Sequence, residues 1–177
     1  DQYIENLCGF ETWKNFNPDY TIGSVHYLRQ FDNNEFFTLD YSKELFQKGL
    51  EEIFENDIKK LVKEYYSAIS KMVSTQKPEI VGHLNLITKF NKGNYFFDES
   101  EKWYKDIVAE TLEVISKNNV IIEINTRGFY RKLTDEFYPS HSILEQCFKL
   151  KIPVMINSDA HQSSELDKNI AEAKKTL

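Results

Sequence analysis

The chain has 177 residues, of which 41% are hydrophobic and 14% aromatic, so it can bury a sizeable core and is not a disordered segment. Its net charge of −6 and its lack of any run of basic residues argue against nucleic-acid binding. No apolar run could cross a membrane, no signal peptide begins the chain, and Cys8 and Cys147 lack metal-type spacing, which together predict a cytoplasmic protein with reduced, packed thiols.

The first part of the chain predicts a strand, a loop and a helical segment. Residues 20–28 alternate and are rich in β-forming side chains, which predicts a strand, and residues 30–40 predict a loop. Over residues 42–76, apolar side chains recur at steps of three and four residues. This spacing predicts a single helix, or two helices separated by a break at Gly49 or Asn56.

The rest of the chain alternates short apolar strands with amphipathic helices. The predicted strands are residues 79–84, 118–126 and 152–159. The predicted helices are a segment that starts at a capping box of Asp98 and Glu101, residues 138–151 opened by Pro139, and a mostly polar tail over residues 163–177. Such alternation favours parallel strands with right-handed crossovers, so we expect an α/β fold of four β/α units in a single domain over residues 1–177. An open sheet and part of a barrel fit this order equally well.

Six polar side chains follow or end these predicted strands. They are His26, His83, Glu123, Asn125, Asp159 and His161. Because the carboxyl ends of parallel strands meet at one edge of a sheet or barrel, we expect these side chains to lie close together. Taken singly, His26 and His83 are each typical of a packed core histidine, and Asp159 with His161 of an ordinary loop and helix cap. Three imidazoles and a carboxylate at one edge instead favour a metal site.

Four segments resemble successive motifs of the PHP metallophosphoesterase family, and in particular of its histidinol-phosphatase branch. They are IGSVHYL, IVGHLNLITKFN, IIEINTRGFY followed by YPS, and SDAH, and the resemblance runs from about residue 19 to the end of the chain. It implies part of a distorted, TIM-like (β/α)7 barrel with a trinuclear centre of Zn, Mn or Fe at the carboxyl ends of the strands. Two residues depart from the pattern of this branch: it usually has Asp at the position of Asn85, and commonly Gly at the position of Asn157.

The resemblance also implies the ligands of that centre. His26 and His83 would hold one ion together with a glutamate, Asp159 a second ion and His161 the third, with Asp159 and His161 as the catalytic residues. The family's opening H-x-H, its second-strand histidine and its bridging glutamate have no match in this sequence. We therefore expect these ligands, with the amino-terminal strands of the barrel, to precede Asp1.

The activity that the resemblance implies is metal-dependent phosphomonoester hydrolysis, most specifically of L-histidinol phosphate and water to L-histidinol and phosphate in histidine biosynthesis. We expect Arg127 and Lys89 to bind the phosphate, and Glu123 and Asn125 the rest of this small metabolite. Solvated surface charges and a satisfied barrel interior are the plainer alternatives for these four residues. Two other functions stay open: a PHP phosphoesterase for another phosphoester, such as phosphotyrosine or a nucleotide, and an inactive truncated barrel. Neither nucleic acid nor a membrane is an expected partner, and the oligomeric state is open.

Overall fold

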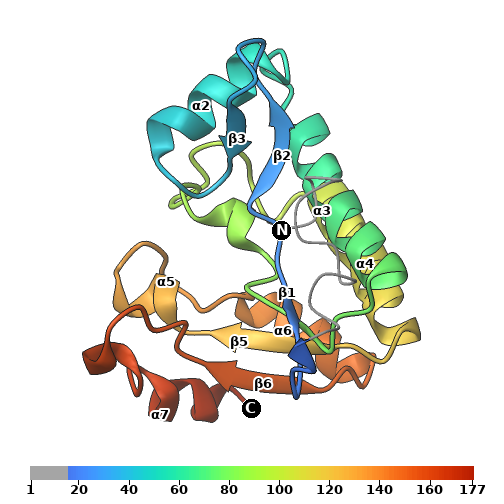
Figure 1. Ribbon diagram of the computed structural model, residues 1–177, viewed down its shortest axis with the longest axis vertical. Coiled ribbons are helices and arrows are strands. Elements are labelled where there is room, and N and C mark those ends of the chain that lie inside the picture. The colour runs from blue at the N-terminus through green and yellow to red at the C-terminus, as the bar shows by residue number, and fades with distance from the viewer. Residues whose placement is uncertain (1–15) are drawn as a thin grey trace.

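The computed structural model, which describes residues 16–177, contains a sheet of four parallel strands, which lies in the lower half of the view in Figure 1. The strands, in their order across the sheet, are β1 (Ile22–Gly23), β4 (Ile80–Val81), β5 (Ile121–Asn125) and β6 (Val154–Asn157). Each strand is parallel to its neighbour, and the order across the sheet is the order along the chain. This arrangement confirms the predicted α/β class with a parallel sheet, and it brings the carboxyl ends of all four strands to one edge.

The strand predicted at residues 20–28 is wrong as a single strand. The chain leaves the parallel sheet after two residues and forms β2 (Tyr27–Gln30), which pairs in antiparallel fashion with β3 (Phe36–Thr38) in a separate two-stranded sheet. The loop predicted over residues 30–40 therefore contains a strand. Phe37 is fully buried at its centre, and this burial anchors the second arm of the hairpin in the core.

The long amphipathic segment forms two helices, α2 (Lys43–Glu52) and α3 (Ile58–Thr75). Each begins after a residue whose side chain accepts a hydrogen bond from a backbone N–H of the first turn, Ser42 for α2 and Asp57 for α3. Between the helices, Asn56 has a φ of 61°, in the left-handed region where a right-handed helix cannot continue. The predicted break at Asn56 is therefore confirmed.

The alternative break at Gly49 is wrong, because this glycine lies inside α2 and faces the ring of Phe37. A Cβ atom at this position would lie within 2.6 Å of three ring atoms, much closer than van der Waals contact. Overpacking of this kind costs about 1–3 kcal/mol, whereas alanine gains about 1 kcal/mol in helix propensity. We expect Gly49→Ala to lower the free energy of unfolding by up to about 2 kcal/mol on these estimates. Chemical denaturation measures this loss of stability, and Gln47→Ala on the exposed face of α2 is the control. A Gly49→Ala protein as stable as the wild type would contradict the close packing.

The next helix, α4 (Lys102–Lys117), packs along α3 (Figure 1). Between the two helices, the hydroxyl groups of Tyr66 and Tyr104 form a hydrogen bond of 3.0 Å, which satisfies two buried polar groups. The predicted capping box is wrong. The carboxylate of Asp98 accepts a hydrogen bond from the backbone N–H of Ser100 in a turn before the helix, so its capping capacity is used before α4 begins.

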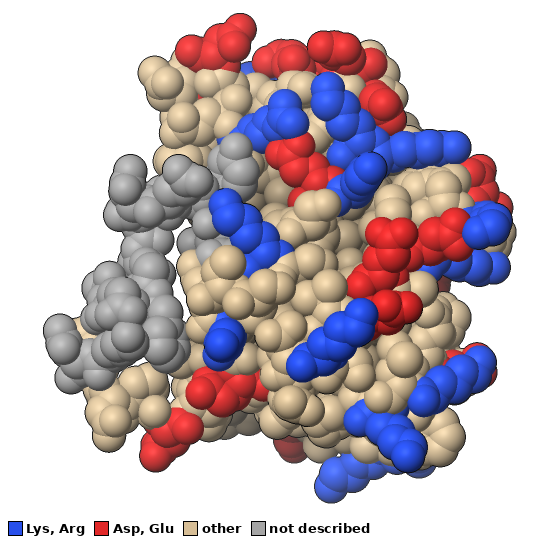
Figure 2. All heavy atoms as spheres, turned by 90° about the vertical axis from the view of Figure 1, so that its right-hand side faces the viewer, with Lys and Arg blue, Asp and Glu red and all other residues tan. Residues whose placement is uncertain are grey.

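Charges of both signs cover the outside of this part of the molecule. Figure 2, which views the right-hand side of Figure 1, shows Lys and Arg side chains interspersed with Asp and Glu. Two ion pairs at i,i+4 spacing lie on α4, Lys102 with Asp106 and Lys117 with Glu113. Exposed ion pairs of this kind add little stability, so we interpret these charges as an ordinary solvated surface.

The last long helix, α6 (His141–Lys149), lies beside α4 (Figure 1). It begins after Ser140, so the predicted opening at Pro139 is wrong by two residues and the proline precedes the helix. A smaller apolar cluster of Ile124, Leu144 and Ala173 joins this helix to the sheet and the tail.

The predicted polar helix over residues 163–177 is also wrong. The tail instead forms short pieces: η3 (Ser163–Glu165), α7 (Ile170–Ala173) and η4 (Lys174–Thr176). Asn169, with a φ of 57°, lies between the first two and prevents a continuous helix. Two further short helices that the sequence did not predict, α5 (Arg127–Tyr130) and η2 (Leu86–Thr88), follow the carboxyl ends of β5 and β4. None of the helices in the described part of the chain is long and apolar enough to cross a membrane.

Cys147 lies on the buried face of α6, as the packed-thiol interpretation predicts, whereas Cys8 lies outside the described residues. Burial raises the pKa of the Cys147 thiol to about 12. Because the thiolate is the reactive form and is scarce well below that pH, we expect Cys147 in a Cys8→Ser protein to resist iodoacetamide at pH 8. Mass spectrometry checks this against the same protein in denaturant, where alkylation should be complete. Rapid labelling of the folded protein would contradict the buried position.

Candidate active site

A cavity of about 380 Å³ lies at the carboxyl ends of the parallel strands. Its lining includes six of the predicted site residues, namely His26, His83, Lys89, Arg127, Asp159 and His161. The other two, Glu123 and Asn125, belong to β5 and are buried behind this lining, to which they are hydrogen-bonded. The structure thus brings all the predicted site residues to one place, at the edge that the parallel topology predicts.

The two histidines that follow β1 and β4 face each other. The rings of His26 and His83 lie edge to face, with 4.9 Å between their centroids. The backbone N–H of His83 donates a 2.7 Å hydrogen bond to Oε2 of Glu123, which fixes the chain where it leaves β4. His83 also has a φ of 24°, an uncommon backbone conformation for a residue with a side chain. Contacts across the sheet, rather than local preference, therefore hold this histidine in place.

His83 has a nitrogen suited to a metal ion. Its side-chain Nδ1 is buried and has no hydrogen-bond partner among residues 16–177. Burial, followed by the nearby His26, lowers the pKa of His83 to about 4, so the imidazole is neutral at pH 7. A buried imidazole nitrogen that lacks a partner is costly to a fold unless something outside the chain binds it.

Asp40 is a site residue that the sequence did not reveal. Its Oδ1 lies 3.3 Å from Nδ1 of His26, and its backbone oxygen accepts a 2.6 Å hydrogen bond from Nζ of Lys89. Burial raises the pKa of Asp40, but the hydrogen bond and charge of His26, with Lys89 and His83, outweigh it and leave the pKa lowered. The β2–β3 hairpin brings Asp40 back to His26, through a backbone hydrogen bond from Leu39 to His26. The available signal was the alternation after the Asn33-Asn34 turn, which indicates the second arm of a hairpin.

Asp159 and His161 lie just beyond the end of β6. The carboxylate of Asp159 accepts a 3.2 Å hydrogen bond from the side-chain amide of Asn125. Nδ1 of His161 lies 3.0 Å from the backbone oxygen of Asp159 and 3.8 Å from its Oδ1. Asp159 has a φ of 50°, so the chain turns sharply here and both side chains stay beside the cavity although neither belongs to the strand.

Glu123 and Asn125 hold the wall of the cavity together. Glu123 accepts hydrogen bonds from His83, from Asn125 at 3.0 Å and from the side-chain amide of Asn157 at 2.6 Å. Asn125 also accepts a 2.9 Å hydrogen bond from the backbone N–H of Arg127. These contacts favour the interpretation of a satisfied interior over direct contact with substrate. Asn157, one of the two residues that depart from the branch pattern, donates one of the hydrogen bonds to Glu123.

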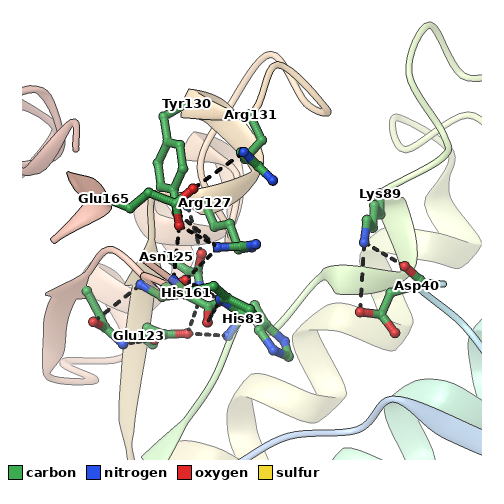
Figure 3. A network of polar contacts seen from close by, with 12 residues as sticks. Asp40, His83, Lys89, Glu123, Asn125, Arg127, Tyr130, Arg131, His161 and Glu165 are labelled. Carbon is green, nitrogen blue, oxygen red and sulfur yellow. Dashed lines mark hydrogen bonds and ion pairs between the residues drawn. The ribbon is translucent and has the colours of Figure 1, made fainter. Parts of the chain in front are cut away.

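The two predicted phosphate-binding cations approach the cavity from opposite sides (Figure 3). Arg127 opens α5, and its three side-chain hydrogen bonds to described residues all run through Nη1, to the backbone oxygen of Asp159, to Tyr130 and to Glu165. Lys89, at the end of η2, is held by Asp40 on the other side. Glu165 was also missed, because the sequence placed it in a polar tail helix and no local signal marks it as buried.

The residues present supply part of a coordination shell for a divalent ion. Over residues 16–177, no three His, Cys, Asp or Glu side chains are placed to hold one ion together. The donors form two pairs, His26 with His83 and Asp159 with His161. Imidazole nitrogen with carboxylate oxygen is the donor set that suits Zn, Mn or Fe, and the unpartnered Nδ1 of His83 agrees with it. The prediction that the four residues share one metal centre stays a prediction.

Comparison with known proteins finds relatives of this chain. The family model described as "PHP domain" matches residues 10–127. The chain is 28% identical, over 179 residues, to the "Probable histidinol-phosphatase" of Deinococcus radiodurans, covering all of this chain and 58% of that protein. It is 28% identical, over 154 residues, to the "Histidinol-phosphatase" of Bacillus subtilis, covering 84% of this chain and 54% of that protein. The chain therefore spans a little over half the length of these curated relatives.

A solved structure shares the fold. The crystal structure of a protein from Listeria monocytogenes, described as a "putative histidinol phosphatase", superposes with a TM-score of 0.76 at 21% sequence identity. The match covers 93% of this chain and 62% of that one. At this level of identity the likeness concerns the path of the backbone, which is common to both.

Proposed function

The chain belongs to the PHP domain family, and on that premise we propose that it acts in a metal-dependent phosphomonoesterase that hydrolyses L-histidinol phosphate to L-histidinol and phosphate in histidine biosynthesis. The observation that carries the proposal is one cavity whose lining includes two facing imidazoles, two carboxylates and an arginine. The names of the relatives from Deinococcus and Bacillus support the choice of a small phosphorylated substrate. The cytoplasmic location expected from the sequence stays a prediction.

The architecture that accompanies this proposal is one domain over residues 1–177. We propose that it is part of a distorted (β/α)7 barrel, of which this chain holds four β/α units. The four parallel strands in chain order support this interpretation, since a barrel of this type adds each strand beside the previous one.

For the metal centre we propose that His26 and His83 hold one divalent ion, Asp159 a second and His161 a third. When bound, such ions lower the pKa of water and offset charge on phosphoryl oxygens. Asp40 supports the role of His26, because a carboxylate at Nδ1 fixes the ring and directs Nε2 away from it. Glu123 plays the corresponding part for His83 by holding its backbone.

The remaining chemistry falls to side chains on the two sides of the cavity. Arg127 binds phosphate oxygens through the part of its guanidinium that does not hold Asp159, Tyr130 and Glu165. Lys89 brings a second positive charge from the opposite side. Asp159, held by Asn125, orients the water that attacks phosphorus while the bond to the leaving alcohol oxygen breaks.

The test is a substrate comparison on the full-length protein with added Mn²⁺, Zn²⁺ or Fe²⁺. We expect the highest kcat/KM with L-histidinol phosphate and lower values with phosphotyrosine and a nucleoside monophosphate. A chelator should remove the activity, and the metal should restore it. If phosphotyrosine or the nucleotide is the better substrate, the substrate assignment fails; if none of the three releases phosphate, the phosphatase assignment fails.

A further inference from the structure

One buried carboxylate, Glu165, connects several parts of the candidate site. Its Oε2 accepts hydrogen bonds from Nη1 of Arg127 at 3.2 Å, from the hydroxyl of Tyr130 at 3.3 Å and from the backbone N–H of His161 at 3.0 Å. Its Oε1 lies 3.4 Å from Nη1 of Arg131 (Figure 3). Glu165 itself is only 6% exposed. A single side chain thus bonds the phosphate-binding arginine and the loop that carries Asp159 and His161.

These bonds connect the 161–165 segment with α5, which lies 35 or more residues before Glu165 in the chain. Glu165 belongs to η3, Arg127 opens α5 after β5, and His161 follows β6. The bonds to Glu165, Tyr130 and the backbone oxygen of Asp159 leave Nη1 of Arg127 fully engaged. Because Nη1 and Nη2 lie in one rigid plane, holding Nη1 in this way also fixes the direction of Nη2 and Nε.

We propose that Glu165 is a positioning residue for phosphate, which orients the guanidinium of Arg127 and the 159–161 loop in one common geometry. The inference rests on the proposed function, since it takes Arg127 as the phosphate ligand. Glu165 does not line the cavity and acts only through the residues that do. Its carboxylate holds the guanidinium of Arg127 in one orientation, so that a forked contact with phosphate forms at a lower entropic cost.

A second interpretation of the same contacts makes the opposite prediction. If Glu165 only neutralised Arg127, its negative charge would compete with phosphate for the guanidinium, and removing that charge would strengthen phosphate binding. If Glu165 positions Arg127, removing its charge-assisted bonds loosens the fork and weakens phosphate binding. The sign of the change in affinity therefore separates the two roles.

The experiment uses the full-length protein loaded with metal and inorganic phosphate as the probe. We expect Glu165→Gln, which keeps the shape but not the charge, to weaken phosphate binding about tenfold by calorimetry. In an Arg127→Ala background the same substitution should change the affinity by less than about twofold, because the residue through which Glu165 acts is gone. Arg131→Ala is the matched control, since Arg131 also contacts Glu165 but does not line the cavity.

A second measurement needs no ligand. Slow rotation of the Arg127 guanidinium should give separate Nη1 and Nη2 signals by NMR in the wild type and in Arg131→Ala, and these signals should merge in Glu165→Gln. Unchanged Arg127 signals in Glu165→Gln, or equal or tighter phosphate binding in that variant, would overturn the positioning role alone. A wild-type protein that neither binds phosphate nor releases it from any substrate would overturn the proposed function, and the inference with it.

Discussion

Replacement of His83 by alanine is expected to lower the metal content of the protein and to reduce phosphatase activity by more than about 100-fold, the upper range for losing a residue that only supports a metal ligand. The reason is the unpartnered Nδ1 of the buried, neutral imidazole. The fold should tolerate the change, because the variant removes a buried polar atom whose hydrogen-bonding capacity the described residues leave unsatisfied. Elemental analysis, phosphate release and thermal unfolding measure the three quantities on one sample.

The chain offers a matched control for this experiment. His141 lies at the start of α6, its ring is well exposed, and it pairs with Glu145 on the same helix. His141→Ala should leave metal content and activity unchanged. If His83→Ala keeps its full complement of metal, His83 is not a ligand, and its orphaned nitrogen needs another explanation.

Replacement of Arg127 by alanine is expected to lower kcat/KM by one to two orders of magnitude, because a lost charge-assisted contact to phosphate is worth about 1.5–3 kcal/mol. Metal content should not change, since a guanidinium does not bind metal ions. Arg127→Lys should give a kcat/KM between those of the wild type and Arg127→Ala, because a single ammonium keeps the charge but cannot hold Asp159, Tyr130 and Glu165 and make a forked contact with phosphate at the same time. Steady-state kinetics with metal analysis check this series.

Arg131→Ala again serves as the control, because Arg131 belongs to the same short segment but lies outside the cavity lining. Arg127→Ala with the kinetics of the wild type would remove Arg127 from the phosphate site. A fall in metal content in that variant would show that Arg127 acts through the Asp159 backbone that it holds.

The sequence predicted best the parallel strands that come from short, mainly apolar runs. β4, β5 and β6 come from continuous apolar runs with a turn or helix signal on either side, and such runs form strands in parallel sheets. The segment over residues 20–28 has the same alternation whether it forms one strand or divides between two sheets. The division depends on where Phe37 and its neighbours pack, which no local pattern contains.

The candidate site shows the same division. His26, His83 and Asp159 were placed together because the topology alone brings strand ends to one edge. Asp40 and Glu165 were missed because tertiary contacts bring them there, a hairpin in one case and a turn of η3 in the other. Glu123 and Asn125 were found as site residues, but their hydrogen bonds turn them toward the wall of the cavity, which depends on where Asn157 and His83 lie.

The backbone at two of the site residues separates selection for folding from selection for chemistry. His83 and Asp159 both have positive φ. Glycine and asparagine adopt this backbone conformation readily, whereas other residues adopt it at a cost of order 1–3 kcal/mol. A gene drifting under selection for a folded product alone would therefore gain by accepting glycine or asparagine at these positions. If the proposed metal centre is right, the imidazole at 83 and the carboxylate at 159 serve the reaction at a cost to the fold.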